Sequence, residues 1–295
     1  MLRLDHVSKT YRVGSFGSSQ ITAVSDVSLD VEPGQVLSLI GESGSGKTTI
    51  GRMILRLTPV SAGRITFDGT DVSTIGRRAL KDYYRGVQGV FQDPFSSYNP
   101  IFRIDRIFSM IRTGYFPHEE GRAWRGRLDA SLEAVGLTPG DVLGKFPHQL
   151  SGGQLQRLLV ARALLLEIRI LVADEIISML DASTRIDVLN LLGDLKARGL
   201  GIIFITHDLS LGNYISDRTV ILRRGAVVEM GATEKVFGDP RHPYTKMLLA
   251  SVPHLHARWS GEDAASYAQA VDDAGAATTA AELVEVSADH LAAIG

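Results

Sequence analysis

The sequence of 295 residues contains no cysteine. Without thiols the chain cannot form disulfide bonds, thiolate zinc sites, cysteine-held iron–sulfur clusters or a thiol nucleophile. An excess of charge is also missing, because 31 Lys and Arg stand against 33 Asp and Glu. The resulting net charge of −2 offers no general attraction to nucleic acid or to an anionic membrane. We therefore expect no nucleic-acid partner, and any membrane partner has to be met through local features.

Long apolar runs are scarce as well. The run at 202–205 ends at Thr206, far short of the roughly 20 apolar residues that cross a bilayer. The N-terminus carries Asp5 and Lys9 where the apolar core of an export signal would lie. We expect neither a membrane span nor export. With 44% hydrophobic residues, the chain still has enough apolar side chains for one large or two modest cores.

Hydrophobic periodicity predicts an α/β fold. A β-rich N-terminal part precedes residue 41, helical spacing dominates 101–166, and strands alternate with helices again from 170. The expected strands are 2–7, 24–31, 36–40, 64–67, 170–173, 202–205 and 220–222. The expected helices begin at 48 and cover 101–111, 124–135, 154–166 and 186–195.

One segment matches a phosphate-binding loop. The sequence Gly41-Glu-Ser-Gly-Ser-Gly-Lys47-Thr48, called the phosphate loop below, lies between a predicted buried strand and a predicted helix. Glycines let backbone N–H groups converge on phosphate oxygens, toward which the next helix directs its positive end. Lys47 is expected to reach the β- and γ-phosphates, and the Thr48 hydroxyl to ligate Mg²⁺. The flanking elements argue against the alternative, a Gly- and Ser-rich surface turn. The expected nucleotide-binding residues are Gly41, Ser43, Gly44, Ser45, Gly46, Lys47, Thr48 and Thr49.

A second segment places two carboxylates at the end of an apolar strand. Asp174 and Glu175 follow Ile170-Leu-Val-Ala, where burial of charge is costly unless a cation or a reacting water is held there. We predict that Asp174 belongs to the magnesium shell and that Glu175 polarises the attacking water. Taken alone, the pair could equally mark a helix start, and the phosphate loop favours the functional interpretation.

A third segment, residues 150–154, begins a predicted helix and is called the signature segment below. Its residues Ser151, Gly152, Gly153 and Gln154 expose N–H groups at a second positive helix end. A capped helix start without a ligand is the alternative. One nucleotide needs one phosphate loop, so a second anion site in the same chain suggests that it serves the nucleotide of another subunit.

With these three motifs, the sequence resembles the ATP-binding-cassette family from Tyr11 to about Pro253. The resemblance implies that the signature segment of one subunit closes over ATP held by the phosphate loop of its partner. It also implies a P-loop NTPase core with an N-terminal antiparallel β subdomain and an inserted α-helical subdomain. The expected cassette covers 1–255 with the helical insertion at about 93–165, and 256–295 forms a peripheral or partly disordered extension.

The resemblance also assigns roles to single residues. It implies that Tyr11 stacks on adenine and that Gln92 approaches Mg²⁺ while its loop senses the membrane domain. It implies that Asp181 lies in a loop crossing the dimer interface and that His207 lies near the γ-phosphate. Three of these residues have a plainer alternative: packing for Tyr11, an ordinary polar loop position for Gln92 and an unremarkable His after a strand for His207.

Two departures from the family pattern lie near the acidic pair. Ile176 and Ile177 replace the usual Pro and small or polar residue after the catalytic Glu, and Ile168 stands where Pro is common. We predict altered packing under the interface loop and a different dimer closure, with hydrolysis retained.

Three stretches resemble the peptide-importer branch of the family: 92–100, 146–153 and 242–253. The branch implies uptake of di- or oligopeptides, with an oligosaccharide importer as the alternative cargo class. It implies a second ATPase, either a non-identical paralogue or a second copy, with two transmembrane permeases and, indirectly, an extracytoplasmic solute-binding protein. The expected location is peripheral, on the cytoplasmic face of the inner membrane. The alternative functions are those of a non-transport cassette ATPase and of a small-molecule kinase. A kinase would not need the signature segment.

Overall fold

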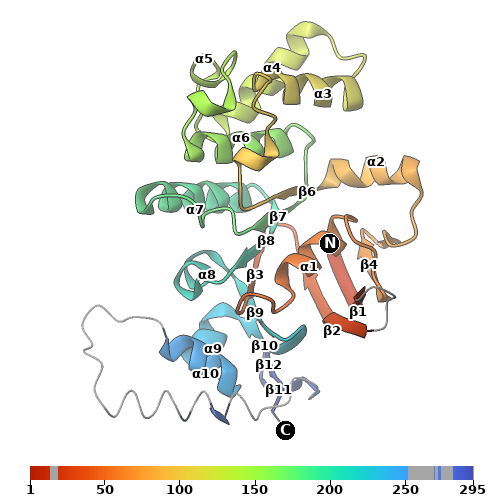
Figure 1. Cartoon of the computed structure of the whole chain (residues 1–295), viewed down its shortest axis with the longest axis vertical. Coiled ribbons are helices and arrows are strands. Elements are labelled where there is room, and N and C mark those ends of the chain that lie inside the picture. The colour runs from red at the N-terminus through yellow and green to blue at the C-terminus, as the bar shows by residue number, and fades with distance from the viewer. Residues whose placement is uncertain (14–18, 252–268, 270–271, 274–281, 295) are drawn as a thin grey trace. The chain divides into compact units, whose positions relative to one another are not determined.

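The computed structural model describes residues 1–13, 19–251, 269, 272–273 and 282–294. The chain forms two compact units, shown in Figure 1. Unit 1 comprises Met1–Ile75 with Ile202–Gly295, and unit 2 comprises Gly76–Gly201. None of the described helices has the length and apolar character that crossing a bilayer requires.

An antiparallel sheet forms the N-terminal part of unit 1. Its strands pair in the order β2-β1-β4-β5. The bounds are β1 (Leu2–Val13), β2 (Ser19–Val31), β4 (Ala62–Phe67) and β5 (Thr70–Asp71). Alternation places Leu2 and Leu4 in the core, and Val7 is also buried, after a shift of register between Leu4 and Val7. The predicted antiparallel β subdomain is confirmed.

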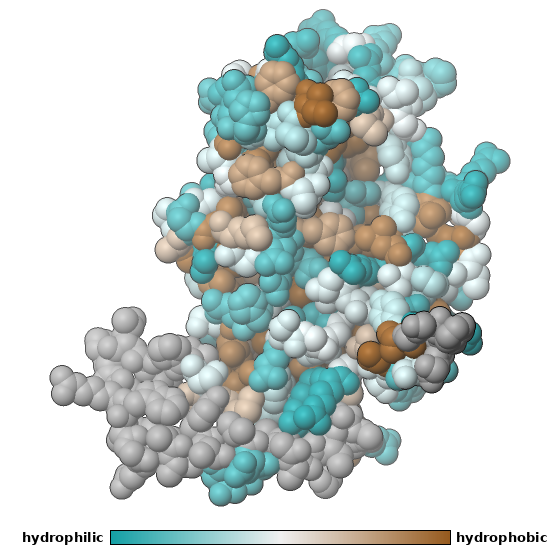
Figure 2. Space-filling model, viewed as in Figure 1, coloured by the Kyte–Doolittle hydropathy of each residue, from teal (hydrophilic) through white to brown (hydrophobic). Residues whose placement is uncertain are grey.

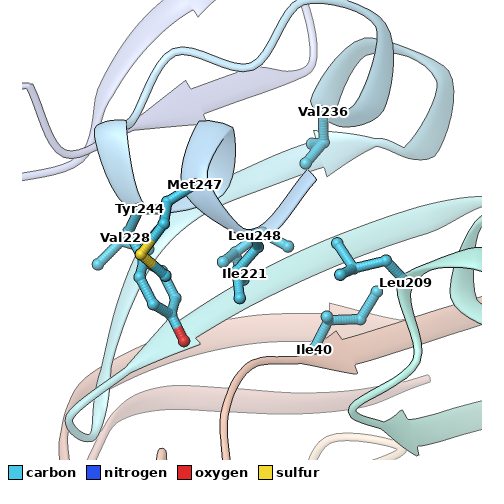
Figure 3. Packing of buried hydrophobic residues seen from close by; sticks show 8 residues of the cluster. All are labelled: Ile40, Leu209, Ile221, Val228, Val236, Tyr244, Met247 and Leu248. Atoms are coloured by element: carbon cyan, nitrogen blue, oxygen red, sulfur yellow. The ribbon is translucent and has the colours of Figure 1, made fainter. Parts of the chain in front are cut away.

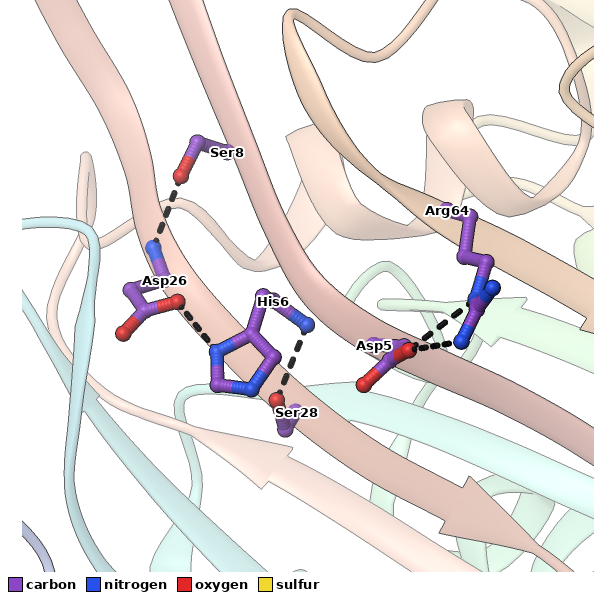
Figure 4. A network of polar contacts seen from close by, with 6 residues as sticks. All are labelled: Asp5, His6, Ser8, Asp26, Ser28 and Arg64. Carbon is purple, nitrogen blue, oxygen red and sulfur yellow. Dashed lines mark hydrogen bonds and ion pairs between the residues drawn. The ribbon is translucent and has the colours of Figure 1, made fainter.

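Polar contacts tie three strands of this sheet together (Figure 4). Asp5 of β1 pairs with Arg64 of β4 at 2.8 Å. His6 Nδ1 lies 2.8 Å from Asp26 Oδ1 of β2. His6 and Asp26 both have positive φ, and the β1–β2 register shifts between Leu4 and Val7. The sheet therefore bends here at a bulge, and hydrogen bonds to side chains replace part of the regular ladder.

The second sheet part of unit 1 is built around β3 (Val36–Ile40), with β8 (Gly201–Thr206) on one side and β9 (Arg218–Arg223) on the other. Both neighbours run parallel to β3, and β10 (Ala226–Ala232) returns antiparallel beside β9. All five residues of β3 are buried. Its one polar residue, Ser38, shares a hydrogen bond of 2.9 Å with Thr219 of β9. A continuous apolar strand covered on both faces is typical of parallel sheets.

Helices of unit 1 cover this sheet with one apolar cluster (Figure 3). The helices that contribute to the cluster are α8 (Leu209–Ile215), α9 (Thr233–Gly238) and α10 (Pro243–Ala250), whereas α1 (Lys47–Ile54) follows the phosphate loop. The buried cluster consists of Ile40, Leu209, Ile221, Val228, Val236, Tyr244, Met247 and Leu248. It packs α10 directly onto β9, β10 and the end of β3.

Unit 2 pairs two parallel strands, β6 (Val87–Val90) and β7 (Ile170–Asp174), and is otherwise helical. Its helices are α2 (Arg77–Gly86), α3 (Asp105–Tyr115), α4 (Gly121–Glu133), α5 (Pro139–Val142), α6 (Gly152–Leu164) and α7 (Ala182–Ala197), with short 3₁₀ turns at Phe95–Ser97 and Pro147–Gln149.

Two helix predictions in unit 2 need correction. The expected helix start at Ile101 is wrong, because Asn99 Oδ1 accepts the Ile101 N–H at 3.0 Å in a turn. Helix α3 therefore begins only at Asp105. Helix α2 was not predicted, because only Tyr83 and Gly86 of its ten residues are buried. An apolar face this small produces no helical hydrophobic periodicity in the sequence.

The C-terminal extension differs from the sequence-based expectation in its described part. Strands β11 (Val284–Ser287) and β12 (His290–Ala292) form a hairpin, and β12 pairs with β10. His290 is 1% exposed, and its Nε2 lies 2.7 Å from Oε1 of the fully buried Glu229. Residues 282–294 are thus built into the sheet of unit 1. The rest of 256–295, apart from 269 and 272–273, lies outside the described residues.

The buried His242 makes the stability of unit 1 depend on pH. Burial lowers the pKa of its imidazole, an effect that Glu229 opposes and Arg223 reinforces. As pH falls through about 6.5, the unfolded chain takes up a proton that the folded chain does not bind, so the unfolding free energy falls. His242 Nδ1 accepts the Tyr244 N–H at the start of α10, a role that Asn can also fill.

We expect the His242→Asn variant to lose less unfolding free energy than the parent between about pH 7.5 and 5.5. Urea unfolding at several pH values measures the difference. His118→Asn, at an exposed position, is the matched control and should leave the pH slope unchanged. An identical slope in the parent and in His242→Asn would contradict the assignment.

Candidate functional site

The phosphate loop and His207 lie at the same edge of the unit 1 sheet. Ile40, the last residue of β3, pairs with Thr206 of β8 and with Ile221 of β9. Residues that follow these strands therefore leave the sheet side by side, at the carboxyl ends of parallel strands. The phosphate loop begins at Gly41 and His207 follows Thr206 directly, so the fold brings these two predicted site elements together.

Lys47 is buried inside the phosphate loop, with 5% of its surface exposed. Its Nζ donates to the carbonyls of Gly41 and Glu42, at 2.6 and 2.8 Å, and to Ser45 Oγ at 3.3 Å. A buried ammonium surrounded by loop oxygens holds a positive charge at the start of α1. Positive charge and a helix N-terminus together form an anion-binding site.

Close backbone contacts explain two of the loop glycines. A Cβ on Gly41 would lie 2.1 Å from the Leu222 carbonyl oxygen. Gly46 has φ 104°, and a Cβ there would lie 2.5 Å from the Ala23 carbonyl oxygen. The loop is thus pressed against β9 and β2, and only glycine fits at both positions.

The other unit 1 site residues lie at the loop surface or on the antiparallel sheet. Ser43 and Gly44 are exposed, Thr48 and Thr49 are partly exposed in the first turn of α1, and His207 is exposed between β8 and the Asp208 cap of α8. Tyr11 lies in β1 opposite Ile21, 37% exposed, with the Lys9 ammonium 5.0 Å from its ring centroid. An exposed aromatic face suits a stacking role, which stays a prediction.

In unit 2, Gln92 and the acidic pair also follow neighbouring parallel strands. Val90 of β6 pairs with Ala173 of β7, so Gln92 and Asp174 leave the same edge. Asp174 is 5% exposed, whereas Gln92 is exposed. Glu175 has φ 50°, a left-handed conformation that is unusual outside glycine, and its carbonyl accepts from the Ser178 N–H and hydroxyl at 3.1 and 2.9 Å. This turn fixes the direction in which the chain leaves the strand.

The two isoleucines after Glu175 are core residues. Ile176 and Ile177 are 1% and 2% exposed, and Ile168 is 9% exposed. The turn after the acidic pair is therefore anchored by apolar burial. The effect of these residues on dimer closure stays a prediction.

The signature segment forms a reciprocal cap at the start of α6. Ser151 Oγ accepts the Gln154 N–H at 3.2 Å, and Gln154 Oε1 accepts the Ser151 N–H at 3.0 Å. The predicted helix start is confirmed. This capping box uses the side chains of Ser151 and Gln154, and the N–H groups of Gly152 and Gly153 lie in the first helical turn, whose donors have no acceptor inside a helix.

Asp181 caps the neighbouring helix α7. Its carboxylate accepts from the Ser183 hydroxyl at 2.6 Å and from the Thr184 N–H and hydroxyl at 3.0 and 2.8 Å. These hydrogen bonds hold the pKa of Asp181 well below its usual range, and the bond from Ser183 has the largest effect. Thr184 also faces Gly153, where an added Cβ would lie 2.6 Å from Thr184 Cγ2. The signature segment and the Asp181 cap are therefore in direct contact within unit 2.

Apart from Tyr11 on the antiparallel sheet, the predicted site residues fall into three groups. The phosphate loop and His207 share one edge in unit 1, Gln92 shares another with Asp174 and Glu175 in unit 2, and the signature segment contacts the Asp181 cap. Among the described residues, no three His, Asp or Glu side chains gather as a metal site.

Sequence reasoning missed Thr184, Gly225 and Tyr244. Gly225 donates its N–H to Ser45 O at 3.0 Å, and Tyr244 accepts the Glu42 N–H. Only Tyr244 had a signal, its place in the importer-like stretch 242–253, of which 252–253 lie outside the described residues.

Comparison with protein families gives two matches. A family model described as "ABC transporter" matches residues 24–178. A second, described as "Oligopeptide/dipeptide transporter, C-terminal region", matches residues 228–276.

Related sequences agree with these matches. A protein named as a peptide import ATP-binding protein from Brucella ovis is 43% identical over 238 residues, 80% of this chain and 74% of that protein. The glutathione import ATP-binding protein GsiA of Escherichia coli is 43% identical over 237 residues, 79% of this chain and 37% of that protein.

Solved structures share the fold. A dimeric post-hydrolysis state of an ATP-binding cassette bound to ADP and Pi has a TM-score of 0.70 at 28% identity, covering 79% of this chain and 99% of that one. The structure of cbiO1 from Clostridium perfringens, part of the ABC transporter complex cbiONQ, has a TM-score of 0.70 at 24% identity, covering 81% of this chain and 90% of that one. At 24% identity, the similarity to cbiO1 supports the fold alone.

The contact between Gly153 and Thr184 gives a prediction for unit 2. Gly153→Ala should lower the unfolding free energy by about 1 to 3 kcal/mol, because the new methyl group overlaps Thr184 Cγ2. Adding Thr184→Ser removes Cγ2 but keeps the hydroxyl that donates to Asp181, so the double variant should recover most of the loss. Denaturant unfolding of the single and double variants tests this, and equal losses in both would refute it.

Proposed function

The chain belongs to the ATP-binding-cassette (ABC) transporter family as an ATP-hydrolysing subunit, and from this premise we propose that it powers the import of peptides or related solutes. The observation that carries the proposal is the combination of two matched regions in one chain: the ABC core and the C-terminal region of oligopeptide and dipeptide transporters. The names of the relatives, for peptide and glutathione import, support the same cargo class.

The phosphate loop binds the triphosphate of ATP in this proposal. The Lys47 ammonium, which lies beside the carbonyls of Gly41 and Glu42, binds the β- and γ-phosphates. Backbone N–H groups of Ser43, Gly44 and Gly46 and the N-terminus of α1 complete the cradle. Tyr11 stacks on the adenine ring.

Three predicted metal ligands have side chains that suit a magnesium ion. Thr48 supplies a hydroxyl, Gln92 an amide oxygen and Asp174 a carboxylate, all of them hard oxygen donors. When bound, the ion would neutralise charge on the β- and γ-phosphates. Asp174 is buried at the end of β7.

In this proposal, Glu175 and His207 take part in the hydrolysis of ATP. The Glu175 carboxylate accepts a proton as the water oxygen forms a bond to the γ-phosphorus, and the bond from that phosphorus to the bridging oxygen of ADP breaks. His207, exposed beside the phosphate loop, donates a hydrogen bond to the γ-phosphate.

A second ATPase completes the site. The signature segment presents N–H groups at the start of α6 and binds the γ-phosphate held by the partner's phosphate loop. The dimeric cassette bound to ADP and Pi supports such pairing. ATP then favours the closed dimer, and loss of the γ-phosphate favours separation. The second ATPase is a non-identical paralogue or a second copy.

Two membrane permeases are the further partners, and the chain acts at the cytoplasmic face of the membrane. Unit 2 exposes six large apolar side chains, and four of them lie between residues 95 and 110, which supports docking there: Phe95, Ile101, Phe102 and Met110. In Figure 2, brown atoms break the otherwise hydrophilic surface around the helices at the top of the view. A solute-binding protein takes part indirectly, and an oligosaccharide importer is the alternative cargo class.

Glu175→Gln tests the mechanism. The amide keeps the shape but cannot accept the proton, so ATP hydrolysis should fall by about 10²- to 10⁴-fold while ATP binding persists. Phosphate release and ATP binding are measured on the full-length chain in complex with its membrane subunits. Glu133→Gln, an exposed carboxylate of α4, is the control and should hydrolyse at the parent rate. Hydrolysis at the parent rate by Glu175→Gln would overturn the role of Glu175.

Co-purification tests the transporter assignment. A transporter subunit should bring down two polytopic membrane proteins, a cassette translation factor would bring down ribosomes, and a small-molecule kinase would bring down neither. The ligand that raises the melting temperature of the associated solute-binding protein identifies the cargo.

A further inference from the structure

One peptide group of the phosphate loop is held from both sides. The carbonyl of Gly41 accepts a hydrogen bond from Lys47 Nζ at 2.6 Å. The N–H of Glu42, which belongs to the same peptide group, donates to Tyr244 Oη at 3.1 Å. A peptide group is planar, so fixing the direction of its N–H also fixes the direction of its carbonyl. We propose that Tyr244 is a positioning residue of the phosphate loop, which orients this peptide group and, through it, the ammonium of Lys47.

Tyr244 has the rigidity that this role requires. It is 1% exposed, and its ring lies in the apolar cluster with Val228 and Met247 (Figure 3). The guanidinium of Arg223 lies 5.0 Å from its ring centroid. A ring packed on all sides keeps its hydroxyl at a fixed point. The hydroxyl thus provides a stationary acceptor for a loop that is otherwise largely exposed at Glu42, Ser43 and Gly44.

The helix that carries Tyr244 is itself anchored to the sheet. Glu229 of β10 is fully buried, and its carboxylate accepts the N–H groups of Arg241 and His242 at 2.7 and 3.0 Å. His242 Nδ1 then accepts the N–H of Tyr244 at 3.0 Å. The first turn of α10 is therefore fixed to β10 by hydrogen bonds to a charged acceptor, which are stronger than neutral ones.

In this proposal, the chain of contacts keeps the loop partly ordered in the absence of ATP. Without the Tyr244 hydroxyl, the Glu42 N–H loses its acceptor and the peptide group can turn, taking the Gly41 carbonyl away from Lys47. The loop then has to be ordered at the expense of binding free energy. The inference rests on the proposed function in one respect: that the phosphate loop binds ATP.

Tyr244→Phe tests the proposal, because it removes the hydroxyl and keeps the ring. The Kd of the full-length chain for ATP should rise by about 2- to 10-fold, the usual effect of one buried hydrogen bond. Thr245→Val is the matched control on the same helix. Thr245 is 1% exposed, and its hydroxyl makes no hydrogen bond among the described residues. This control should bind ATP as the parent does, and an unchanged or lower Kd in Tyr244→Phe would overturn the proposal.

A double-mutant cycle separates positioning from a general loss of stability. If Tyr244 acts through Lys47, Tyr244→Phe should change the Kd for ATP by less than about twofold in a Lys47→Ala background. Equal effects in both backgrounds would mean that Tyr244 does not act through Lys47. Titrations are made well below the unfolding midpoints. Failure of the parent chain to bind ATP would refute the proposed function itself, which distinguishes the two failures.

Amide hydrogen exchange in the unmutated chain gives a test that needs no variant. The Glu42 amide should exchange at least tenfold more slowly than that of the exposed Gly44 in the absence of ATP. Equal exchange rates at the two positions would overturn the proposal even if Tyr244→Phe fails to fold.

Discussion

The parallel register at the end of β3 is the constraint on which the unit 1 site depends. Because Ile40 pairs with both Thr206 and Ile221, three segments leave the sheet at one level: the phosphate loop, the His207 segment and the turn after β9. Shifting any one strand by one residue would reverse its side chains between the two faces of the sheet. Because β3 is fully buried, such a shift would be costly in free energy. The packed core therefore fixes the positions of the site residues that follow these strands.

The phosphate loop is therefore shaped as much by its surroundings as by its own sequence. The Ala23 and Leu222 carbonyls leave room only for glycine, and the Gly225 N–H holds Ser45. None of these three residues belongs to the motif. Lys47 is kept within the loop by carbonyl oxygens that accept hydrogen bonds from its buried ammonium. The conformation of the phosphate loop therefore depends on residues outside its own motif.

Features that depend on local pattern were predictable from the sequence, and features that depend on distant contacts were not. The loop between β3 and α1 and the capped start of α6 follow from short motifs and hydrophobic period. The partly buried α2 lacked such a period, and the late start of α3 depends on a turn at Asn99. The partners of Tyr244 and Glu229 lie far away in sequence. Nothing in the residues around them indicates that Glu42 and His290 complete their hydrogen bonds.

The pairing of Glu229 with His290 has a consequence for how the protein is made. The two residues are 61 positions apart, so a ribosome adding about 5 to 20 residues per second finishes β10 roughly 3 to 12 seconds before it reaches β12. During that interval the edge of β10 is open, and its backbone N–H and C=O groups can pair with another nascent chain. The hairpin of β11 and β12 can close this edge only after both of its strands have been synthesised.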